Sequence, residues 1–375
     1  MTMRADSYRG KKVLITGHTG FKGSWLCRIM GLLGADVYGY SIGPPTDPNL
    51  YTMLELENTV TSVTGDVADF ESLSDFYRRT KPDFVFHLAA QPLVRAGYSD
   101  PQGTYRTNVM GTVNVMECVR RYGAQSILNV TTDKVYRNVE DWDHRYREGE
   151  VLEGYDPYSN SKSCSELVTW TYVRSFPDAM CPVSTARAGN VIGGGDFADD
   201  RIIPDCVKAA VSGKEVVLRN PRSVRPYQHV LEPLYAYLAL VIGQSEDPEL
   251  AGCYNVGPEV SDCTTNGELV DRFCKYWGRG LKWVSSDSKG PHEAEFLKLD
   301  NSKLHDNLGI RPIWGIDEAV RRTVEWVDSW NSGKDVGAVT DTQIREYLKG
   351  RGIDVRRQDR KAGTGRDPAG GVRVL

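Results

Sequence analysis

A tyrosine and a lysine with catalytic spacing lie in the segment Asp156-Pro-Tyr158-Ser-Asn-Ser-Lys162. The segment begins a helical pattern, and positions i and i+4 share one face of a helix, so the two side chains are neighbours. The charge of Lys162 can lower the pKa of Tyr158. The phenolate can then take the proton of a hydroxyl group while a hydride leaves the same carbon. Because this spacing also occurs by chance in structural helices, it indicates alcohol oxidation only where a hydride acceptor binds nearby.

A second polar group, Thr132-Asp133-Lys134, closely follows the apolar run Ser126–Val130, which we predict to be a strand. In a parallel sheet the carboxyl ends of the strands face the ligand crevice. A hydroxyl, a carboxylate and an ammonium group can assist alcohol oxidation, proton abstraction next to a ketone and the departure of water. The alternative is a polar strand exit with both charges solvated. The Tyr158–Lys162 pair favours the catalytic interpretation.

The hydride acceptor is indicated near the N-terminus, by Lys12-Val-Leu-Ile-Thr-Gly17-His-Thr-Gly20-Phe-Lys-Gly23. Gly17 permits a tight turn, Gly20 lets the backbone approach a pyrophosphate, and Gly23 lets a helix pack closely on the strand. The helix N-terminus attracts the negative charge. Glycines alone are a weak signal, but the strand before and the helix after them are both present. We therefore expect a nicotinamide dinucleotide to bind this short-chain dehydrogenase form of the turn, at Gly17, Thr19, Gly20, Phe21, Lys22 and Gly23.

The residue that separates NAD from NADP is not evident in the sequence. An acidic residue about 20 positions after the turn usually binds the adenosine ribose. The second predicted strand ends instead in Tyr40-Ser-Ile42, with neither a carboxylate nor an arginine. Asp66, after the third predicted strand, can contact the adenine end of the cofactor or can simply cap the helix that follows.

Short β-rich runs alternate with amphipathic stretches over the first two thirds of the chain, which is typical of a parallel sheet with crossover helices. Predicted helices include Phe70–Arg79, Thr104–Tyr122 and Pro157–Arg174. The alternation predicts an α/β fold with a doubly wound parallel sheet of the Rossmann type. The predicted strands are Lys12–Thr16, Asp36–Tyr40, Val60–Thr64, Phe84–Leu88, Ser126–Val130 and Val183–Ala186.

The regular alternation ends near residue 190, where glycines cluster at 193–195. We expect a dinucleotide-binding domain at residues 1–190 and a smaller mixed α/β substrate lobe at residues 191–335. Within the lobe, Val216–Leu218 and Cys253–Val256 could return to the main sheet. Residues 336–375 form a C-terminal extension whose end, 356–375, has few large apolar residues, so we expect it to be mobile rather than a functional basic arm.

The composition excludes several function classes. The net charge is −4, so neither nucleic acid nor an anionic membrane is indicated as a partner. No apolar run approaches the length of about 20 residues that spans a bilayer. The eight cysteines form no Cys-x-x-Cys pair, so we expect no metal site, no disulfide framework and a cytoplasmic location.

Ordered motifs extend these observations along most of the chain. They are Gly17-His-Thr-Gly-Phe-Lys-Gly-Ser-Trp25-Leu, His87-Leu-Ala-Ala-Gln91-Pro-Leu-Val-Arg95, Thr107-Asn108-Val-Met-Gly-Thr, Gly154-Tyr-Asp-Pro-Tyr158-Ser-Asn-Ser-Lys162, Arg187-Ala-Gly-Asn190-Val-Ile-Gly-Gly-Gly-Asp196, Asp200-Arg201-Ile-Ile-Pro-Asp205, Arg225-Pro-Tyr-Gln-His229-Val-Leu-Glu-Pro and Pro291-His292-Glu-Ala. With these motifs the chain, from about Lys11 to Trp330, resembles the CDP-glucose 4,6-dehydratases of the extended short-chain dehydrogenase/reductase superfamily.

The resemblance is most specific at Lys134, where the related dTDP-glucose dehydratases carry glutamate. Two positions depart from the family pattern. Thr132 replaces the usual serine and keeps the hydroxyl group, whereas Tyr227 replaces the usual tryptophan and could change how the nucleotide packs.

The resemblance implies an internal redox cycle on a nucleotide sugar, with NAD as the cofactor. Tyr158, with Lys162, would deprotonate the 4-hydroxyl as its hydride moves to NAD. Lys134 would then take the proton from carbon 5, while Asp133 protonates the departing 6-hydroxyl. Return of the hydride to carbon 6 would leave a 4-keto-6-deoxy sugar. A lysine base needs a lowered pKa, which burial or proximity to Lys162 can supply.

The resemblance also implies binding residues and a homodimer whose interface contains the helices at 104–122 and 157–174. Arginine forks suit a diphosphate, although each can also form a surface ion pair, and a lone histidine is more often structural. For NAD the further residues are Asp66, Val67, Leu88, Ala89, Ala90 and Asn108, together with Tyr158 and Lys162. For the nucleotide sugar they are Gln91, Arg95, Asn190, Arg201, Arg219, Arg225, His229 and His292.

Two other functions stay open at this point. A nucleotide-sugar 4-epimerase, or a dehydratase for another nucleotide, shares the superfamily, but an epimerase needs only the tyrosine–lysine pair. A non-catalytic protein that senses NAD(P) on the same fold is the more remote alternative, since fold does not fix function. The residues at 132–134 favour the dehydratase.

Overall fold

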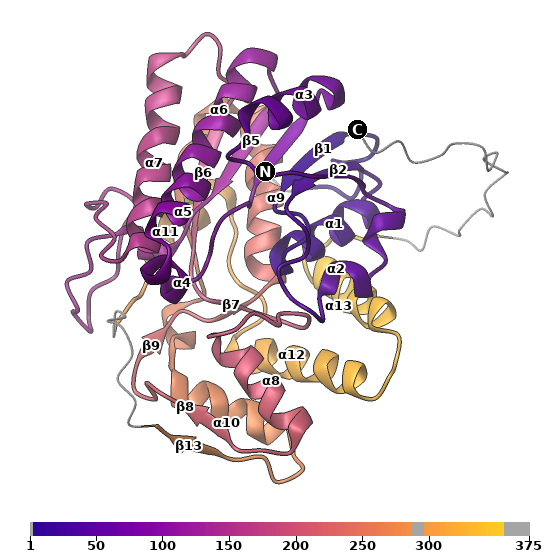
Figure 1. The fold of residues 1–375 in the computed structure, drawn as a ribbon, viewed down its shortest axis with the longest axis vertical. Helices are drawn as coiled ribbons and strands as arrows, with labels where there is room; N and C mark the ends of the chain where they lie inside the picture. The colour runs from indigo at the N-terminus through magenta and orange to yellow at the C-terminus, as the bar shows by residue number, and fades with distance from the viewer. Residues whose placement is uncertain (1–2, 287–295, 356–375) are drawn as a thin grey trace, which may run out of the picture.

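The computed structural model describes residues 3–286 and 296–355 of the chain. Its core is the expected doubly wound sheet, with seven parallel strands in the order β11-β6-β5-β4-β1-β2-β3 (Figure 1). The strands are β1 (Lys12–Thr16), β2 (Asp36–Ser41), β3 (Thr61–Thr64), β4 (Phe84–His87), β5 (Ser126–Val130), β6 (Val183–Ala188) and β11 (Cys253–Val256). Every strand that we predicted from the sequence is present, within two residues of its expected bounds.

The central strands are buried on both faces because helices cover the sheet on each side. Along β1, Val13 and Ile15 belong to one core cluster, and Leu14 between them belongs to a second. Successive side chains of a strand point to opposite faces, so this alternation assigns the two clusters to the two faces. Near-continuous apolar runs such as Phe84–His87 are typical of strands in such parallel sheets.

Helices α3 and α6 pack on the Leu14 face, whereas α1 and the buried helix α9 pack on the opposite face. The predicted helix at 104–122 consists of three segments, because a π-helical turn at Arg106–Met110 separates α5 from α6. The α-helices are α1 (Phe21–Leu32), α2 (Leu50–Met53), α3 (Phe70–Thr80), α4 (Val94–Ser99), α5 (Pro101–Tyr105), α6 (Gly111–Tyr122), α7 (Pro157–Ser175), α8 (Ile202–Ser212), α9 (Leu231–Glu246), α10 (Asn266–Trp277), α11 (Ser302–Leu308), α12 (Ile316–Asn331) and α13 (Val336–Gly350).

A smaller lobe containing α8, α10 and α12 lies beyond the carboxyl edge of the sheet, at the bottom of Figure 1. The two strands that could return to the main sheet differ in outcome. Cys253–Val256 does return, as edge strand β11 beside β6. Val216–Leu218 does not: as β8 it pairs in parallel with β13 (Trp283–Ser285) inside the lobe. Two-residue strands complete the lobe, namely β7 (Val191–Ile192), β9 (Val224–Arg225), β10 (Gln228–His229) and β12 (Thr264–Thr265).

The first part of the C-terminal extension is packed against the body of the protein. In α13, Asp341 forms an ion pair with Arg28 of α1 at 2.6 Å, and Thr340 accepts a hydrogen bond from the Trp326 indole of α12. The expected mobile end, 356–375, lies outside the described residues. No helix within residues 3–286 and 296–355 is long and apolar enough to cross a membrane.

Candidate active site

The turn after β5 holds the three predicted catalytic residues close together. The Thr132 hydroxyl donates a hydrogen bond to Asp133 Oδ1 at 3.0 Å, and Lys134 Nζ lies 3.4 Å from the same oxygen. The Asp133 side chain is only 1% exposed and lines the pocket described below. Its second oxygen, Oδ2, has no hydrogen-bond partner in the described part of the chain. Asp133 therefore lines the pocket with one buried carboxylate oxygen that no described group satisfies.

The start of α7 fixes the tyrosine and the lysine. The Asp156 carboxylate caps the helix by accepting hydrogen bonds from the Tyr158 and Ser159 amides at 3.0 and 3.1 Å. One turn farther along, Lys162 Nζ donates to the Val130 carbonyl oxygen at 3.0 Å. This contact ties the α7 lysine to the end of β5, directly before the turn that carries Thr132.

The titration of the pair differs from the expectation that Lys162 lowers the pKa of Tyr158. Burial raises the pKa of Tyr158 to about 12, although a hydrogen bond with Thr132 opposes this shift. Burial, assisted by the charge of Lys22, lowers the pKa of Lys162 to about 7, against the opposing effect of Glu166. Burial is therefore the largest influence on the pKa of both residues. The Lys162 ammonium group donates its hydrogen bond to a backbone carbonyl.

The glycine turn fits a pyrophosphate. Gly17 has a φ of +74°, and a Cβ atom there would lie 2.7 Å from the Ala89 amide nitrogen. A Cβ at Gly23 would lie 2.2 Å from the Gly17 carbonyl oxygen, whereas one at Gly20 would meet nothing nearer than 3.5 Å. Gly20 also leaves the N-terminus of α1 without a side-chain cap. Backbone N–H groups at an open, uncapped helix start are suited to bind a phosphate group.

Other predicted NAD residues surround this turn. Leu88, Ala89 and Ala90 directly follow β4 and are half-buried beside Gly17. The Thr19 hydroxyl is 2.9 Å from Ser41 Oγ at the end of β2. Phe21 and Lys22 line the pocket. Desolvation, together with the nearby charge of Arg201, lowers the pKa of Lys22 to about 8.

Three predicted NAD residues have internal partners. Asn108, 1% exposed, exchanges hydrogen bonds with the Gln91 backbone and donates to Ser161 Oγ of α7 at 2.8 Å. Val67 belongs to the core. Asp66 accepts a hydrogen bond from the Ala68 amide and lies 3.6 Å from Arg106. Asn108 and Val67 therefore brace the structure beside the glycine turn, and their direct contacts with NAD stay predictions.

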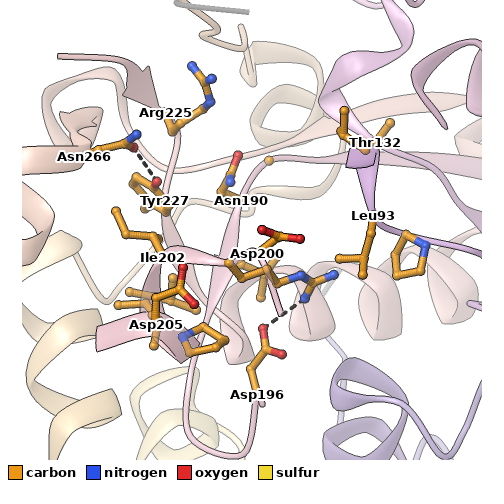
Figure 2. A pocket seen from close by; sticks show the side chains of 18 of the residues that line it. Leu93, Thr132, Asn190, Asp196, Asp200, Ile202, Asp205, Arg225, Tyr227 and Asn266 are labelled. Atoms are coloured by element: carbon orange, nitrogen blue, oxygen red, sulfur yellow. Dashed lines mark hydrogen bonds and ion pairs between the residues drawn. The ribbon is translucent and has the colours of Figure 1, made fainter. Parts of the chain in front are cut away.

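One pocket joins the sheet edge to the lobe (Figure 2). Thr132 and Leu93 lie at one side of the view, and Arg225, Tyr227 and Asn266 lie together at the other. Its polar lining at the catalytic end comprises Lys22, Thr132, Asp133, Lys134 and Tyr158. The remaining polar lining includes Arg95, Asn190, Asp196, Asp200, Arg201, Arg219, Asn220, Arg225, Tyr227 and Asn266.

The structure brings five of the predicted substrate residues to this pocket, namely Arg95, Asn190, Arg201, Arg219 and Arg225. Three of these arginines also form ion pairs. Arg201 pairs with Asp196 at 2.9 Å, while Arg219 and Arg95 share Asp200 at 3.1 and 3.3 Å. For each of these three arginines we treated an ion pair and a place in the ligand pocket as alternatives. The structure shows that each arginine has both.

Two predicted substrate residues do not reach the pocket. His229 is fully buried between the rings of Trp25 and Trp314, and burial lowers its pKa to about 3. Gln91 donates to the Thr104 hydroxyl and accepts from the Leu93 amide, so it shapes the loop after β4. In this structure contacts within the protein hold both side chains, and their roles toward the substrate stay predictions. His292 lies outside the described residues.

Sequence reasoning missed much of the lobe's side of the pocket. Asn266 accepts a hydrogen bond from the Tyr227 hydroxyl at 2.6 Å and donates to the Asn220 carbonyl oxygen at 2.8 Å. The other missed residues of the lobe are mainly apolar and include Ile202, Pro204, Val216 and Leu218. Their types carry no chemical signal, and only the folded lobe brings them together.

Comparisons with known proteins agree with this site. The model of the NAD dependent epimerase/dehydratase family matches residues 13–257. CDP-glucose 4,6-dehydratase of Salmonella typhimurium is 43% identical over 91% of this chain and 97% of its own length. dTDP-glucose 4,6-dehydratase of Haemophilus influenzae is 26% identical over 84% of this chain and 97% of its own.

Solved structures share the fold at lower identity. UDP-glucose 4-epimerase of Thermotoga maritima has a TM-score of 0.74 at 21% identity and covers 85% of this chain and 99% of its own. dTDP-glucose 4,6-dehydratase of Bacillus anthracis, solved with NAD, has a TM-score of 0.72 at 22% identity and covers 85% and 97%. Fold similarity thus spans epimerases and dehydratases, while the sequence relationship is closer to a dehydratase. The chain belongs to the NAD dependent epimerase/dehydratase family, in the nucleotide-sugar 4,6-dehydratase branch that includes the Salmonella enzyme.

Proposed function

We propose that the protein converts CDP-glucose into CDP-4-keto-6-deoxyglucose and water, the reaction after which its Salmonella relative is named. The observation that carries the proposal is the shared pocket of Tyr158 and the Thr132-Asp133-Lys134 turn. The glycine turn would hold NAD by its pyrophosphate, within residues 1–190, and the lobe at 191–335 would hold the nucleotide. When bound, NAD accepts the hydride from carbon 4 of the sugar and returns it to carbon 6.

Tyr158 is the residue to receive the proton of the sugar's 4-hydroxyl group. Tyr158 is buried and lines the pocket, and its hydroxyl lies close enough to Thr132 for this residue to influence its pKa. Lys162, held by the Val130 carbonyl, places a titratable ammonium group one helical turn away. Because desolvation raises the pKa of Tyr158, a nearby positive charge must favour the phenolate for the proton transfer to proceed.

Asp133 and Lys134 supply the groups that an elimination needs. Once carbon 4 is a ketone, the proton on carbon 5 is acidic, and Lys134 takes it. Asp133, in its protonated form, gives a proton to the oxygen on carbon 6, which leaves as water. Lys134, whose protons exchange with solvent, then gives a proton to carbon 5 as carbon 6 receives the hydride. The proton that Tyr158 received passes to Asp133, so each residue regains its starting form. The sugar thereby loses one water with no net oxidation.

A 4-epimerase is the second candidate, because an epimerase from Thermotoga shares the fold. An epimerase needs the tyrosine–lysine pair but no acid facing carbon 6. The buried Asp133 lines the pocket beside Lys134, and this pair of groups favours elimination.

The partners and the location follow from surface and thiol chemistry. Met110, at the end of the π-helical turn before α6, and Leu167 of α7 are about half exposed, at 48% and 51%, which suits a homodimer interface on these helices. The eight cysteines are free thiols, as in proteins of the reducing cytoplasm.

Incubation with separate donors tests the proposal. Purified protein with NAD receives CDP-glucose, dTDP-glucose, UDP-glucose or GDP-mannose, and mass spectrometry follows the loss of one water. We expect loss from CDP-glucose alone. Loss of water from another donor would assign the specificity to that nucleotide sugar instead. Loss of water from none of the donors would favour the 4-epimerase.

A further inference from the structure

A single carboxylate joins two arginines in the middle of the pocket. Asp200 Oδ1 lies 3.3 Å from Arg95 Nη1 and 3.1 Å from Arg219 Nη2. Arg95 belongs to α4 at the carboxyl edge of the main sheet, whereas Arg219 follows β8 in the lobe. One acid therefore links cations from the two sides of the pocket. The third arginine, Arg201, has a separate partner in Asp196.

The bridge is easily broken. The Asp200 backbone has a φ of +58°, in the left-handed region that disfavours residues with a Cβ atom. The side chains of Asp200, Arg95 and Arg219 are 37%, 33% and 31% exposed, so water reaches all three. Ion pairs with this exposure contribute little to stability. Asp200 thus forms an ion pair with both arginines, and neither ion pair is strong.

The two arginines suit a diphosphate better than they suit a carboxylate. A diphosphate carries more charge and more acceptor oxygens, which guanidinium forks can bind in pairs. With the sugar beside Tyr158 and the base beside Tyr227, a nucleotide sugar would place its diphosphate between these ends. This placement rests on the proposed function.

We propose that Asp200 is an internal competitor for the substrate's diphosphate and thereby a specificity-determining residue. It neutralises Arg95 and Arg219 in the free enzyme and leaves them when a nucleoside diphosphate arrives. The affinity of any ligand that needs both arginines is then reduced in proportion to the fraction of protein molecules in which the two arginines are free. A ligand without phosphate is not affected. Asp200 therefore rejects weak anions and also limits the binding of the nucleotide-sugar product.

Removal of the competing charge tests the proposal. The D200N variant keeps the side-chain shape, and asparagine tolerates a positive φ. The matched control is D199N, because Asp199 is the adjacent acid, pairs with Lys208 on the surface and does not line the pocket. Isothermal titration measures the binding of CDP and of cytidine to the full-length protein with NAD present.

We expect D200N to bind CDP about three- to tenfold more tightly than the parent protein, with cytidine binding unchanged. D199N should bind both ligands as the parent does. Unchanged or weaker CDP binding by D200N would overturn the proposal, because Asp200 would then orient the arginines for the ligand. Equal tightening in D199N would overturn it too, as a general effect of charge.

Inorganic pyrophosphate separates this inference from the proposed function. If no nucleotide sugar is dehydrated, the proposed function fails, yet tighter pyrophosphate binding by D200N still supports competition by Asp200. If CDP-glucose is dehydrated and D200N gains no affinity, only the competitor fails. Circular dichroism verifies folding, and should D200N not fold, D200G, which suits the φ of +58°, takes its place in the same titrations.

Discussion

The two ends of the pocket are built in different ways. At the catalytic end, Tyr158 and Asp133 come from short contiguous segments fixed to a strand and a helix, with 9% and 1% of each residue exposed. At the nucleotide end, Arg219, Tyr227 and Asn266 come from separate segments of the lobe and meet only in the folded state. Under the proposed function, the first arrangement would give fixed geometry for proton transfer. The second would let the groups that select the nucleotide vary independently of the chemistry.

The largest expected effect comes from a substitution that removes a proton-transfer group at the catalytic end of the pocket. We expect Lys134→Met to lower the rate of dehydration about 10²- to 10⁴-fold, since proton transfer to a positioned group contributes that much. Oxidation at carbon 4 should persist, so reduced cofactor should accumulate in an absorbance assay. Lys208→Met, a surface lysine, is the control. Solvent-deuterium exchange at carbon 5 that continues in Lys134→Met would contradict its role as the base.

The rigidity of the catalytic end depends on a buried ion pair beneath it. Glu166 of α7 lies 3.0 Å from Arg187 of β6, both are almost fully buried, and Glu166 also accepts a hydrogen bond from Thr131. Glu166→Gln leaves the guanidinium without its counter-charge, so we expect a loss of about 3–5 kcal/mol in the free energy of unfolding. Urea denaturation measures it. The exposed pair Arg78–Asp75 is the control, and Asp75→Asn should cost at most about 1 kcal/mol.

The nucleotide end should respond in binding alone. Asn266→Ala removes the hydrogen bond that the Tyr227 hydroxyl donates. We expect KM for CDP-glucose to rise about three- to tenfold, because this is the free energy of one hydrogen bond, and we expect kcat to stay unchanged. Steady-state kinetics separate the two constants. A fall in kcat with constant KM would show that the two ends are not independent.

The smallest expected effect concerns the charge of Lys162. Burial and the charge of Lys22 lower its pKa to about 7. Lys22→Met should raise this pKa, because the like charge is removed. Carbon-13 NMR of reductively methylated, cofactor-free protein, assigned with Lys162→Arg, follows the titration, and an unchanged or lower midpoint would show that Lys22 does not act on Lys162.

The same shift predicts a pH dependence of stability. The folded-state pKa of Lys162 lies below the value of an unfolded lysine, about 10.4. Between about pH 7 and pH 10 the unfolded chain binds the extra proton, so this group makes the folded state more stable as the pH rises. Urea denaturation across this range should show a smaller rise for Lys162→Met than for the parent protein.

Sequence reasoning placed Tyr158 and Thr132-Asp133-Lys134 in contiguous motifs, and the structure brings these residues to one pocket. Periodicity placed every strand of the main sheet except the edge strand at Cys253–Val256, which it left open. It could not show that the His229 ring packs between two tryptophans. A structural histidine and a ligand-binding histidine at this position would give the same sequence motif. It also missed Asn266, whose role depends on contacts with residues about 40 positions away.

The most direct measurement of the central claim is one incubation of protein, NAD and CDP-glucose in deuterated water, with the product analysed by mass spectrometry and NMR. The proposed function predicts a product that has lost one water and carries one deuterium at carbon 5. A product of unchanged mass with inverted carbon 4 would contradict it and would identify the protein as an epimerase.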